Sequence, residues 1–389
     1  MCKVLILFLT LLLPLSSFGQ RHSPEEVGPI FRGRHSPEEM GPAPGRRHLP
    51  EESGGLQFPP AFWLAQPPTD TLTLYAVGDI MCHGAVIRDA AKNGYEGFFK
   101  HIEKDIQGAD IAVGNMEFSL AGKPWSGYPH FSGPDAYAAY LSRVGFDVLL
   151  SANNHILDKG SAGAERTIRE LEARSIRYTG IADTPGKDTL LNPLILSLKG
   201  IRVAIVNFTY GTNLGSSKAW PKVQRMDTLA LKPVMERARS KADVILVFPH
   251  WGVEYALKHS ARQEEMARWL IAQGADAIVG AHPHVVQDVQ WIGGVPVFYS
   301  LGNALSNQND LPARLEATLT LRFVIRLGER PQLLEPRLDY LWCTKPGMVE
   351  DSFSTVPVTL PETYWKVPSD YGQMISTLNA LRVCFERNQ

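Results

Sequence analysis

Residues 72–81 read Leu-Thr-Leu-Tyr-Ala-Val-Gly-Asp-Ile-Met, an apolar run that ends abruptly in a glycine and a carboxylate. The run Leu72–Val77 has the composition of a buried β-strand, since it is bounded by Asp70 before it and by Gly78 and Asp79 after it. Short runs of the same kind recur at 111–113, 148–150, 201–207, 244–248, 277–279 and 297–300. Helical patterns lie between several of them, at 134–144, 161–175, 229–240 and 260–273. This alternation predicts an α/β fold around a central sheet.

The later part of the chain has a different pattern. Apolar runs follow one another without convincing helices between them, at 285–290, 295–300, 315–326 and 333–341. We expect these runs to be antiparallel strands that join the sheet or form a second one. Residues 371–387 predict a closing helix.

Polar residues follow nearly every early strand at the point where the strand ends. In open α/β sheets ligands bind beyond the carboxyl ends of the strands, so these residues are expected to converge on one rim. His282 and His284 lie in a strand-like segment, where a period of two would place both on one face. Two imidazoles together with carboxylates and an asparagine suit a divalent transition metal. For any single histidine, a purely structural hydrogen-bonding role is the alternative.

Several motifs occur in a fixed order along residues 72–310. They are Gly-Asp-Ile-Met at 78–81, Gly-Asn-Met-Glu at 114–117, Ala-Asn-Asn-His-x-Leu-Asp-x-Gly at 152–160, His-Trp-Gly-x-Glu-Tyr at 250–255, Gly-Ala-His-Pro-His-Val-Val-Gln at 280–287 and Tyr-Ser-Leu-Gly-Asn at 299–303. By these motifs the chain resembles the CapA-type capsule synthesis family, also called poly-γ-glutamate capsule biosynthesis proteins. That family is similar to the calcineurin-like metallophosphoesterases. The resemblance implies a metallophosphatase-like fold, a four-layer α/β/β/α sandwich.

The resemblance also implies roles for residues. Metal ligands are expected at Asp79, Asn154, His250, His282 and His284. Catalytic roles are expected for His155, which Asp158 would orient, and for Glu117. Substrate-binding roles are expected for Asn115, Glu254 and Asn303. The cofactor implied is one or two divalent ions of Mn, Zn or Fe.

Two motifs depart from the phosphoesterase pattern. The first has Met81 where those enzymes place a histidine, and methionine is a poor ligand for a hard cation. In the second, Asn115 and Glu117 replace the usual bridging aspartate. Glu117 is therefore expected either to bridge two ions or to act over a single one. Asp158 has an alternative role as a cap of the following helix, and Cys82 is either a ligand or an inert buried thiol.

The N-terminal part is organised differently from the body. Residues 1–19 have the pattern of a signal peptide, with an uncleaved anchor as the alternative. Residues 20–69 contain three 13-residue repeats, which begin at Arg21, Arg34 and Arg47, and their composition predicts a disordered linker. The CapA-like domain is expected over 70–344, with a C-terminal extension packed on it over 345–389. The protein is expected to be exported, and to be periplasmic, cell-surface or secreted.

The amino-acid composition limits the classes of partner and site that the protein can have. The 39 Lys and Arg residues balance 40 Asp and Glu residues, which gives no reason to expect nucleic acid as a partner. The four cysteines form no Cys-x-x-Cys pair, which excludes a zinc ribbon, and Cys343 with Cys384 is a candidate bridge. The leading interpretation is an exported CapA-family protein of capsule, poly-γ-glutamate or other envelope polymer biosynthesis, acting as a metal-dependent hydrolase or transferase on a phosphoester or amide-linked polymer.

Two alternatives to this function stay open. The first is a non-catalytic subunit that binds the polymer or helps its export. The second is a general exported metallophosphatase or nucleotidase. The partner is expected to be an envelope or capsule polymer or a small phosphoester, and a membrane-bound polymer synthase or export complex is a further candidate partner.

Overall fold

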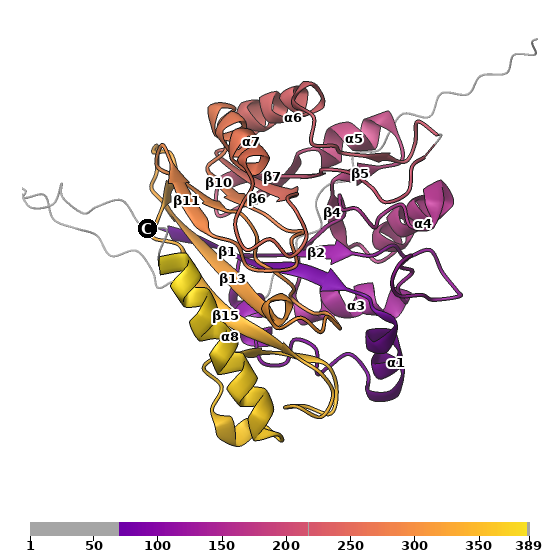
Figure 1. Cartoon of the computed structure of the whole chain (residues 1–389). Coiled ribbons are helices and arrows are strands. Elements are labelled where there is room, and N and C mark those ends of the chain that lie inside the picture. Colours follow the sequence, from indigo (N-terminus) through magenta and orange to yellow (C-terminus); the bar gives the residue numbers. More distant parts are fainter. Residues whose placement is uncertain (1–69, 217, 387–389) are drawn as a thin grey trace, which may run out of the picture. The chain divides into compact units, whose positions relative to one another are not determined.

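A computed structural model describes residues 70–216 and 218–386, with side chains up to residue 381. The signal peptide expected over 1–19 and the linker expected over 20–69 lie outside the described residues. Two β-sheets with helices on their outer faces make up the part that is described (Figure 1). The prediction of an α/β fold is therefore confirmed.

The larger sheet has eight strands within residues 70–357. Its order is β16-β15-β13-β1-β2-β3-β4, with the short β14 paired to β13. The parallel part comprises β1 (Asp70–Met81), β2 (Ile111–Glu117), β3 (Val148–Leu150) and β4 (Arg177–Thr179). The antiparallel part adds β13 (Leu315–Ile325), β14 (Gln332–Leu333), β15 (Arg337–Thr344) and β16 (Ser354–Pro357). The boundary expected at residue 344 falls between two strands of this sheet, so residues 354–357 belong to the sandwich itself.

The second sheet has the order β11-β12-β10-β9-β7-β6. Its strands are β6 (Leu194–Leu198), β7 (Ile201–Thr209), β9 (Val244–His250), β10 (Ala277–Val279), β11 (Val289–Ile292) and β12 (Val295–Phe298). A separate two-stranded ribbon pairs β5 (Ile181–Ala182) with β8 (Lys222–Val223). Strands β1, β2 and β3 run parallel in the larger sheet, and β7, β9 and β10 run parallel in the second sheet. In each sheet the carboxyl ends of these strands therefore meet at one edge.

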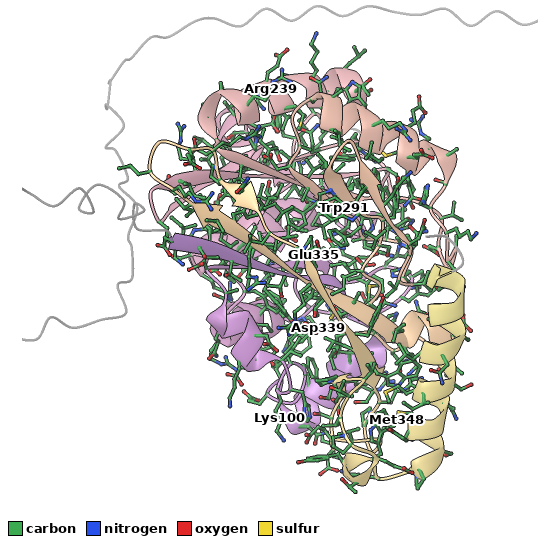
Figure 2. All side chains as sticks on the ribbon, turned by 90° about the vertical axis from the view of Figure 1, so that its left-hand side faces the viewer. Lys100, Arg239, Trp291, Glu335, Asp339 and Met348 are labelled. Atoms are coloured by element: carbon green, nitrogen blue, oxygen red, sulfur yellow. The ribbon has the colours of Figure 1, made fainter. Side chains whose placement is uncertain are left out.

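Helices cover both outer faces of the sheets. On the larger sheet lie α1 (Gly84–Asn93), α2 (Glu103–Gly108), α3 (Asp135–Val144) and α4 (Gly160–Ala173), and on the second sheet lie α6 (Thr228–Lys241) and α7 (Ala261–Ala272). The remaining helices are α5 (Pro185–Leu191), α8 (Pro368–Glu386) and the short 3₁₀ turns η2 (Leu311–Arg314) and η3 (Glu362–Tyr364). The α8 helix lies along β13 and β15, as both views show (Figures 1 and 2). Among the residues described, no helix is both long and apolar enough to cross a membrane.

Three apolar cores fill the spaces between these layers. One lies between α1–α4 and the larger sheet, a second between the facing sides of the two sheets, and a third between the second sheet and α6 with α7. Alternation along β1 explains the division, since Tyr75 and Val77 point into the first core while Leu74 and Ala76 point into the second. The order helix, sheet, sheet, helix is the four-layer α/β/β/α sandwich that the resemblance implied.

Close backbone approach brings the two sheets together at the carboxyl edge. A Cβ atom on Gly78 would lie 2.0 Å from the carbonyl oxygen of Gly302, so only glycine fits there. The next residue, Asp79, donates its N–H to that same oxygen at 2.9 Å. Gly78 thus lets the end of β1 and the segment after β12 meet, which positions Asp79.

One predicted strand is wrong. Residues 282–285 form bends between isolated bridges at Ala281 and Val286, and the strand β11 starts only at Val289. His282 and His284 have φ values of 101° and 59°, a left-handed conformation that a β-strand cannot contain. The alternation that suggested one strand face therefore does not apply to these two histidines. Sequence patterns also missed three helices, α1, α2 and α5.

Candidate metal centre

The two carboxylates of the site lie at the carboxyl edge of the larger sheet. Asp79 lies two residues before the end of β1 and Glu117 ends β2, and both are fully buried. The Oδ1 atom of Asp79 accepts a hydrogen bond from Nδ2 of Asn115 at 2.7 Å, and its Oδ2 accepts one from the N–H of His282 at 3.0 Å. Asn115, for which substrate binding was predicted, thus holds the Asp79 carboxylate in place.

Three histidines reach the same point from the second sheet. His250 ends β9, while His282 and His284 lie in the loop after β10. The Nε2 atom of His250 lies 3.6 Å from Oε1 of Glu117, and Nδ1 of His284 lies 3.3 Å from Oδ2 of Asp79. All three rings are buried. The left-handed backbone at His282 and His284 is a sparsely populated conformation of the kind that clusters at functional sites.

Two overlapping groups of side chains can each surround one cation. The first consists of Glu117, His250 and His282, and the second of Asp79, Glu117 and His284. In each group the ligand atoms lie within 4.8 Å of one another. Glu117 belongs to both groups. Of the two roles that the sequence left open for it, this position suits the one in which it bridges two ions.

Orphaned polar atoms test whether a cation fits. Within the described part of the chain, neither carboxylate oxygen of Glu117 has a hydrogen-bond partner, and the same holds for Nδ1 of His282 and Oδ1 of Asn115. Buried polar atoms are normally paired, and an unpaired buried carboxylate is costly. Oxygen and imidazole nitrogen atoms are ligands of borderline divalent cations. The site therefore fits a divalent metal.

The electrostatics of Asp79 and His284 are coupled. Burial alone would raise the pKa of Asp79, but the hydrogen bond to His284 and the charges of His250 and His284 lower it to about 2. Burial opposes the charged form of His284, yet the contact with Asp79 raises the pKa of that ring above its usual value. In the metal-free protein the two side chains stabilise each other as an ion pair.

The other three groups are pushed toward their neutral forms. Burial and the nearby charges of Asp79 and Glu254 raise the pKa of Glu117 well above its ordinary value. Burial and the neighbouring His282 lower the pKa of His250 far below the usual range. Burial and His284 lower the pKa of His282 to about 3. Two imidazoles are thus neutral and free to bind a cation at physiological pH.

His155 and Asp158 lie in the turn that leads into α4. Nδ1 of His155 lies 2.7 Å from Oδ2 of Asp158, and both side chains are buried. Asn154 precedes them, and its Oδ1 lies 2.8 Å from Nε2 of His250. The structure therefore places Asn154 against the candidate ligand His250, and His155 follows it in the chain. Neither residue belongs to the two ligand groups found among the described residues.

The remaining predicted residues divide in two. Asn303 is fully buried, and its side chain bonds to Nδ1 and the carbonyl of His284 and to the carbonyl of Ala313. These bonds hold His284 in place. Glu254 is exposed beside the cluster, since its charge acts on Glu117. The ring of Tyr210 packs against His282 at a centroid distance of 4.5 Å, and the ring of Tyr255 lies 6.0 Å from that of His284.

The two cysteines whose side chains are described, Cys82 and Cys343, belong to neither ligand group. Cys82 is buried and free, and burial raises the pKa of its thiol, which agrees with the inert alternative. Cys343 is also buried and free, and its thiol donates to the carbonyl of Ser306 at 3.3 Å. Cys343 therefore does not form the disulfide suggested with Cys384. The side chain of Cys384 lies outside the described residues.

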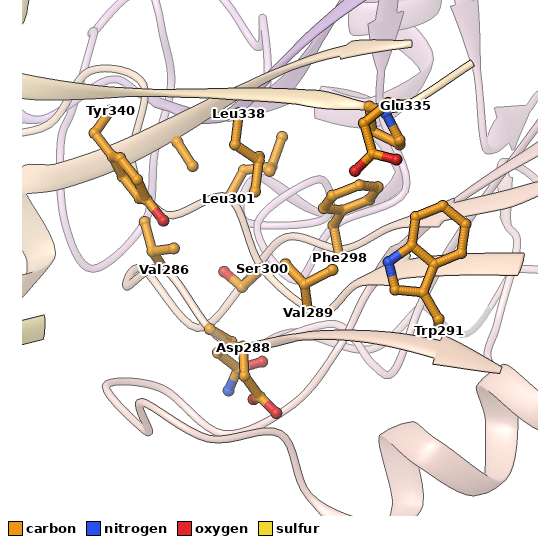
Figure 3. Close-up of a pocket in the computed structure, with 13 residues that line it drawn as sticks. Val286, Asp288, Val289, Trp291, Phe298, Ser300, Leu301, Glu335, Leu338 and Tyr340 are labelled. Carbon is orange, nitrogen blue, oxygen red and sulfur yellow. The ribbon is translucent and has the colours of Figure 1, made fainter. Parts of the chain in front are cut away.

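A cavity of about 220 Å³ lies elsewhere, between β11–β12 and β13–β15. Two residues that line it, Trp291 and Glu335, lie near the middle of the view in Figure 2. Figure 3 shows Trp291 and Tyr340 at opposite ends of the cavity. None of the predicted site residues lines it. The candidate metal ligands therefore lie outside this cavity.

The chain is similar in sequence to bacterial capsule synthesis proteins. The sequence profile described as "Bacterial capsule synthesis protein PGA_cap" matches residues 73–308. The capsule biosynthesis protein CapA of Bacillus anthracis is 32% identical over 251 residues, which cover 61% of each chain. The PGA biosynthesis protein CapA of Bacillus subtilis is 31% identical over 245 residues, 61% of this chain and 64% of that one. The chain thus spans less than two thirds of the length of these relatives.

Among solved structures, a putative 5'-nucleotidase from Staphylococcus aureus superposes with a TM-score of 0.48 at 14% identity. The superposition covers 80% of this chain and 58% of that one.

Proposed function

The chain belongs to the family of bacterial capsule synthesis proteins, and on this basis we propose that its carboxyl-edge site carries out metal-dependent hydrolysis or transfer on an envelope polymer. The bond attacked is a phosphoester or an amide bond of capsule, poly-γ-glutamate or a related polymer. The names of the relatives from Bacillus anthracis and Bacillus subtilis support the polymer class. The signal-peptide pattern of residues 1–19 supports export, so that the protein would act at the cell envelope or outside the cell.

One observation carries this proposal. Both oxygens of Glu117 are buried without a hydrogen-bond partner among the described residues, and Oε1 lies 3.6 Å from Nε2 of His250 and 4.0 Å from Nε2 of His284. A purely structural site would pair that carboxylate with a donor, because an unpaired buried charge destabilises the fold. A cation is the partner that completes the arrangement.

We assign the metal ligands to Glu117, His250 and His282 for one ion, and to Asp79, Glu117 and His284 for a second. When bound, a divalent ion supplies positive charge and a route to a nucleophilic water at neutral pH. The set of nitrogen and oxygen ligands without a thiolate favours Mn²⁺, Zn²⁺ or Fe²⁺. Asn154, whose amide oxygen touches His250, completes the surroundings of the first group.

The chain's own residues supply the proton chemistry. Asp158 holds His155 by its Nδ1 atom, which leaves Nε2 to give a proton to a leaving group or to take one from a nucleophile. Asn303 fixes the ring of His284 in the same way. Oriented imidazoles of this kind keep one tautomer, which is a requirement of general acid–base catalysis.

The test uses full-length protein stripped with a chelator and reconstituted with Mn²⁺, Zn²⁺ or Fe²⁺. Shortening of poly-γ-glutamate and release of phosphate from small phosphoesters are measured in parallel. Glu117→Gln is expected to weaken metal uptake and to abolish turnover. The matched control is Glu335→Gln, whose carboxylate lines the separate cavity, and it is expected to behave as wild type.

The outcomes separate the candidate functions. Phosphate release without polymer cleavage would favour a general metallophosphatase or nucleotidase. Polymer binding without metal uptake or turnover would favour a non-catalytic subunit that binds or exports the polymer, working with a membrane-bound synthase or export complex.

A further inference from the structure

A loop that no sequence motif singled out spans the mouth of the site. It comprises Tyr210–Asn213, directly after β7. The N–H of Tyr210 donates to the carbonyl of His250 at 2.9 Å, and the N–H of Asn213 donates to the carbonyl of Asn154 at 2.8 Å. The loop is therefore tied at both ends to residues of the candidate metal centre.

Asn213 brings an amide group to the outer side of His155. Its Nδ2 atom lies 3.2 Å from Nδ1 and 3.4 Å from Nε2 of that ring. Asn213 is exposed, whereas His155 is buried. A substrate that approaches His155 from solvent therefore meets this amide first.

Arg225 stands behind the same loop. Residue 225 forms a bridge with Thr209, and Nη2 of its guanidinium donates to Oγ1 of Thr212 at 2.7 Å. The side chain is half-buried, and burial lowers its pKa. No carboxylate of the described chain lies within 4.0 Å of this guanidinium, unlike that of Arg166, which pairs with Asp135 at 2.8 Å.

A partly dehydrated guanidinium without an anion is an incomplete arrangement. Its N–H groups form a planar fork that matches a carboxylate or a phosphate and binds either through two parallel hydrogen bonds. We propose that Arg225 and Asn213 form an anion subsite beside His155 that binds a carboxylate or phosphate group of the substrate. This inference rests on the proposed function, in that it assigns a substrate group to the same site.

The experiment measures binding to full-length, chelator-treated protein by titration calorimetry. The probes are a γ-linked glutamate oligomer, its side-chain amide form, which is neutral, and inorganic phosphate. Arg225→Met is expected to weaken binding of the carboxylate oligomer or of phosphate about tenfold or more. Asn213→Ala is expected to weaken it less, and Arg225→Lys is expected to restore part of the affinity.

The matched control is Arg202→Met. The Arg202 guanidinium is ion-paired with Asp243 at the far end of β7, so its loss is expected to leave binding unchanged. If Arg225→Met lost its cooperative melt, Thr212→Val would replace it, since that change keeps the charge and removes only the anchor of the guanidinium. Its expected effect is a loss of affinity of about threefold.

Each result supports or overturns the subsite. Loss for the carboxylate oligomer alone identifies a carboxylate ligand, and loss for phosphate alone identifies a phosphate ligand. Wild-type affinity of Arg225→Met for both, equal binding of the neutral oligomer, or no binding of either anion to the wild type overturns the subsite. Because no metal is present, the readout is independent of turnover. A failed hydrolase assay therefore leaves this result intact, and turnover with an unchanged KM in Arg225→Met contradicts the subsite alone.

Discussion

Oδ2 of Asp158 lies 2.7 Å from Nδ1 of His155, and the same oxygen accepts a hydrogen bond from the N–H of Phe131 at 2.7 Å. The sequence left open whether Asp158 caps the following helix. That helix, α4, starts at Gly160 after Lys159 and has no side-chain cap. Asp158 therefore orients His155, and the ring of Phe131 packs edge-on against it at 4.6 Å.

We predict that Asp158→Asn lowers kcat about 100-fold while KM changes little, because the amide no longer fixes the productive tautomer of His155. His155→Ala is expected to abolish turnover, and both variants are expected to keep a cooperative melt. Steady-state kinetics with the substrate identified in the hydrolysis assay, together with circular dichroism, checks this. An Asp158→Asn enzyme with wild-type kcat would show that the contact is only structural.

Glu117 has opposite effects on the free and the metal-bound protein. Without metal its buried carboxylate is unpaired, so Glu117→Gln is expected to raise the free energy of unfolding by about 1–3 kcal/mol. With metal at 100 times its Kd the wild type is expected to gain about 2.7 kcal/mol, which the variant loses. Thermal melts with and without Mn²⁺ or Zn²⁺ measure both. Destabilisation of the metal-free variant would contradict the unpaired state of Glu117.

Strand–helix alternation allowed much of the fold to be predicted. Buried strands such as β3 and β10 and helices such as α3 and α7 lie within one or two residues of their expected bounds. The helix α7 has a strong local signal, because Ser260 and Gln263 form a capping box. The helix α2 gave little local signal, because it has only six residues and no side-chain cap.

The site was predicted from residues that follow strands, and its details depended on tertiary contacts. The segment of His282 and His284 alternates like a strand, yet both residues have a left-handed backbone. Asp79 accepts the N–H of His282 at 3.0 Å, a contact across 203 positions that no local pattern encodes. Asn213 and Arg225 were missed because their significance arises only from their placement against His155 and the loop after β7.

Glu316 in β13 predicts a pH dependence of stability. It is fully buried, its Oε1 accepts the N–H of Gly78 at 3.1 Å, and burial raises its pKa from 4.5 to about 8. The unfolded chain ionises first as pH rises, so the metal-free protein loses stability from about pH 4.5 to about pH 8, by an amount on the order of 4 kcal/mol.

We predict that Glu316→Gln removes this loss, because the amide oxygen still accepts from Gly78 and carries no charge. Urea unfolding of chelator-treated protein at pH 5 and pH 8 measures the effect. The variant is expected to match the wild type at pH 5 and to be more stable at pH 8. Equal stability at both pH values would place the pKa of Glu316 near its ordinary value.

We predict that a chain starting at residue 70 folds alone. The strand β1 begins at Asp70, and its Leu72 and Leu74 already belong to the core between the sheets. Calorimetry is expected to give a cooperative melt within about 2 °C of that of the longer chain, since changes outside packed elements stay within about 0.5 kcal/mol. A drop of several degrees would show that residues before 70 contribute to stability.

The last prediction concerns the protons that leave when a metal binds. Burial lowers the pKa of both His250 and His282 in the metal-free protein, so both are neutral at physiological pH. Glu117 has a raised pKa and must lose its proton, and the raised pKa of His284 requires the same. Metal affinity is therefore expected to fall with decreasing pH because Glu117 and His284 are protonated, and not through His250 and His282. Calorimetry at pH 6 in buffers of different ionisation heat counts the protons, and Glu117→Gln is expected to release about one fewer than wild type. An equal proton count in the two proteins would show that Glu117 is already ionised before the metal arrives.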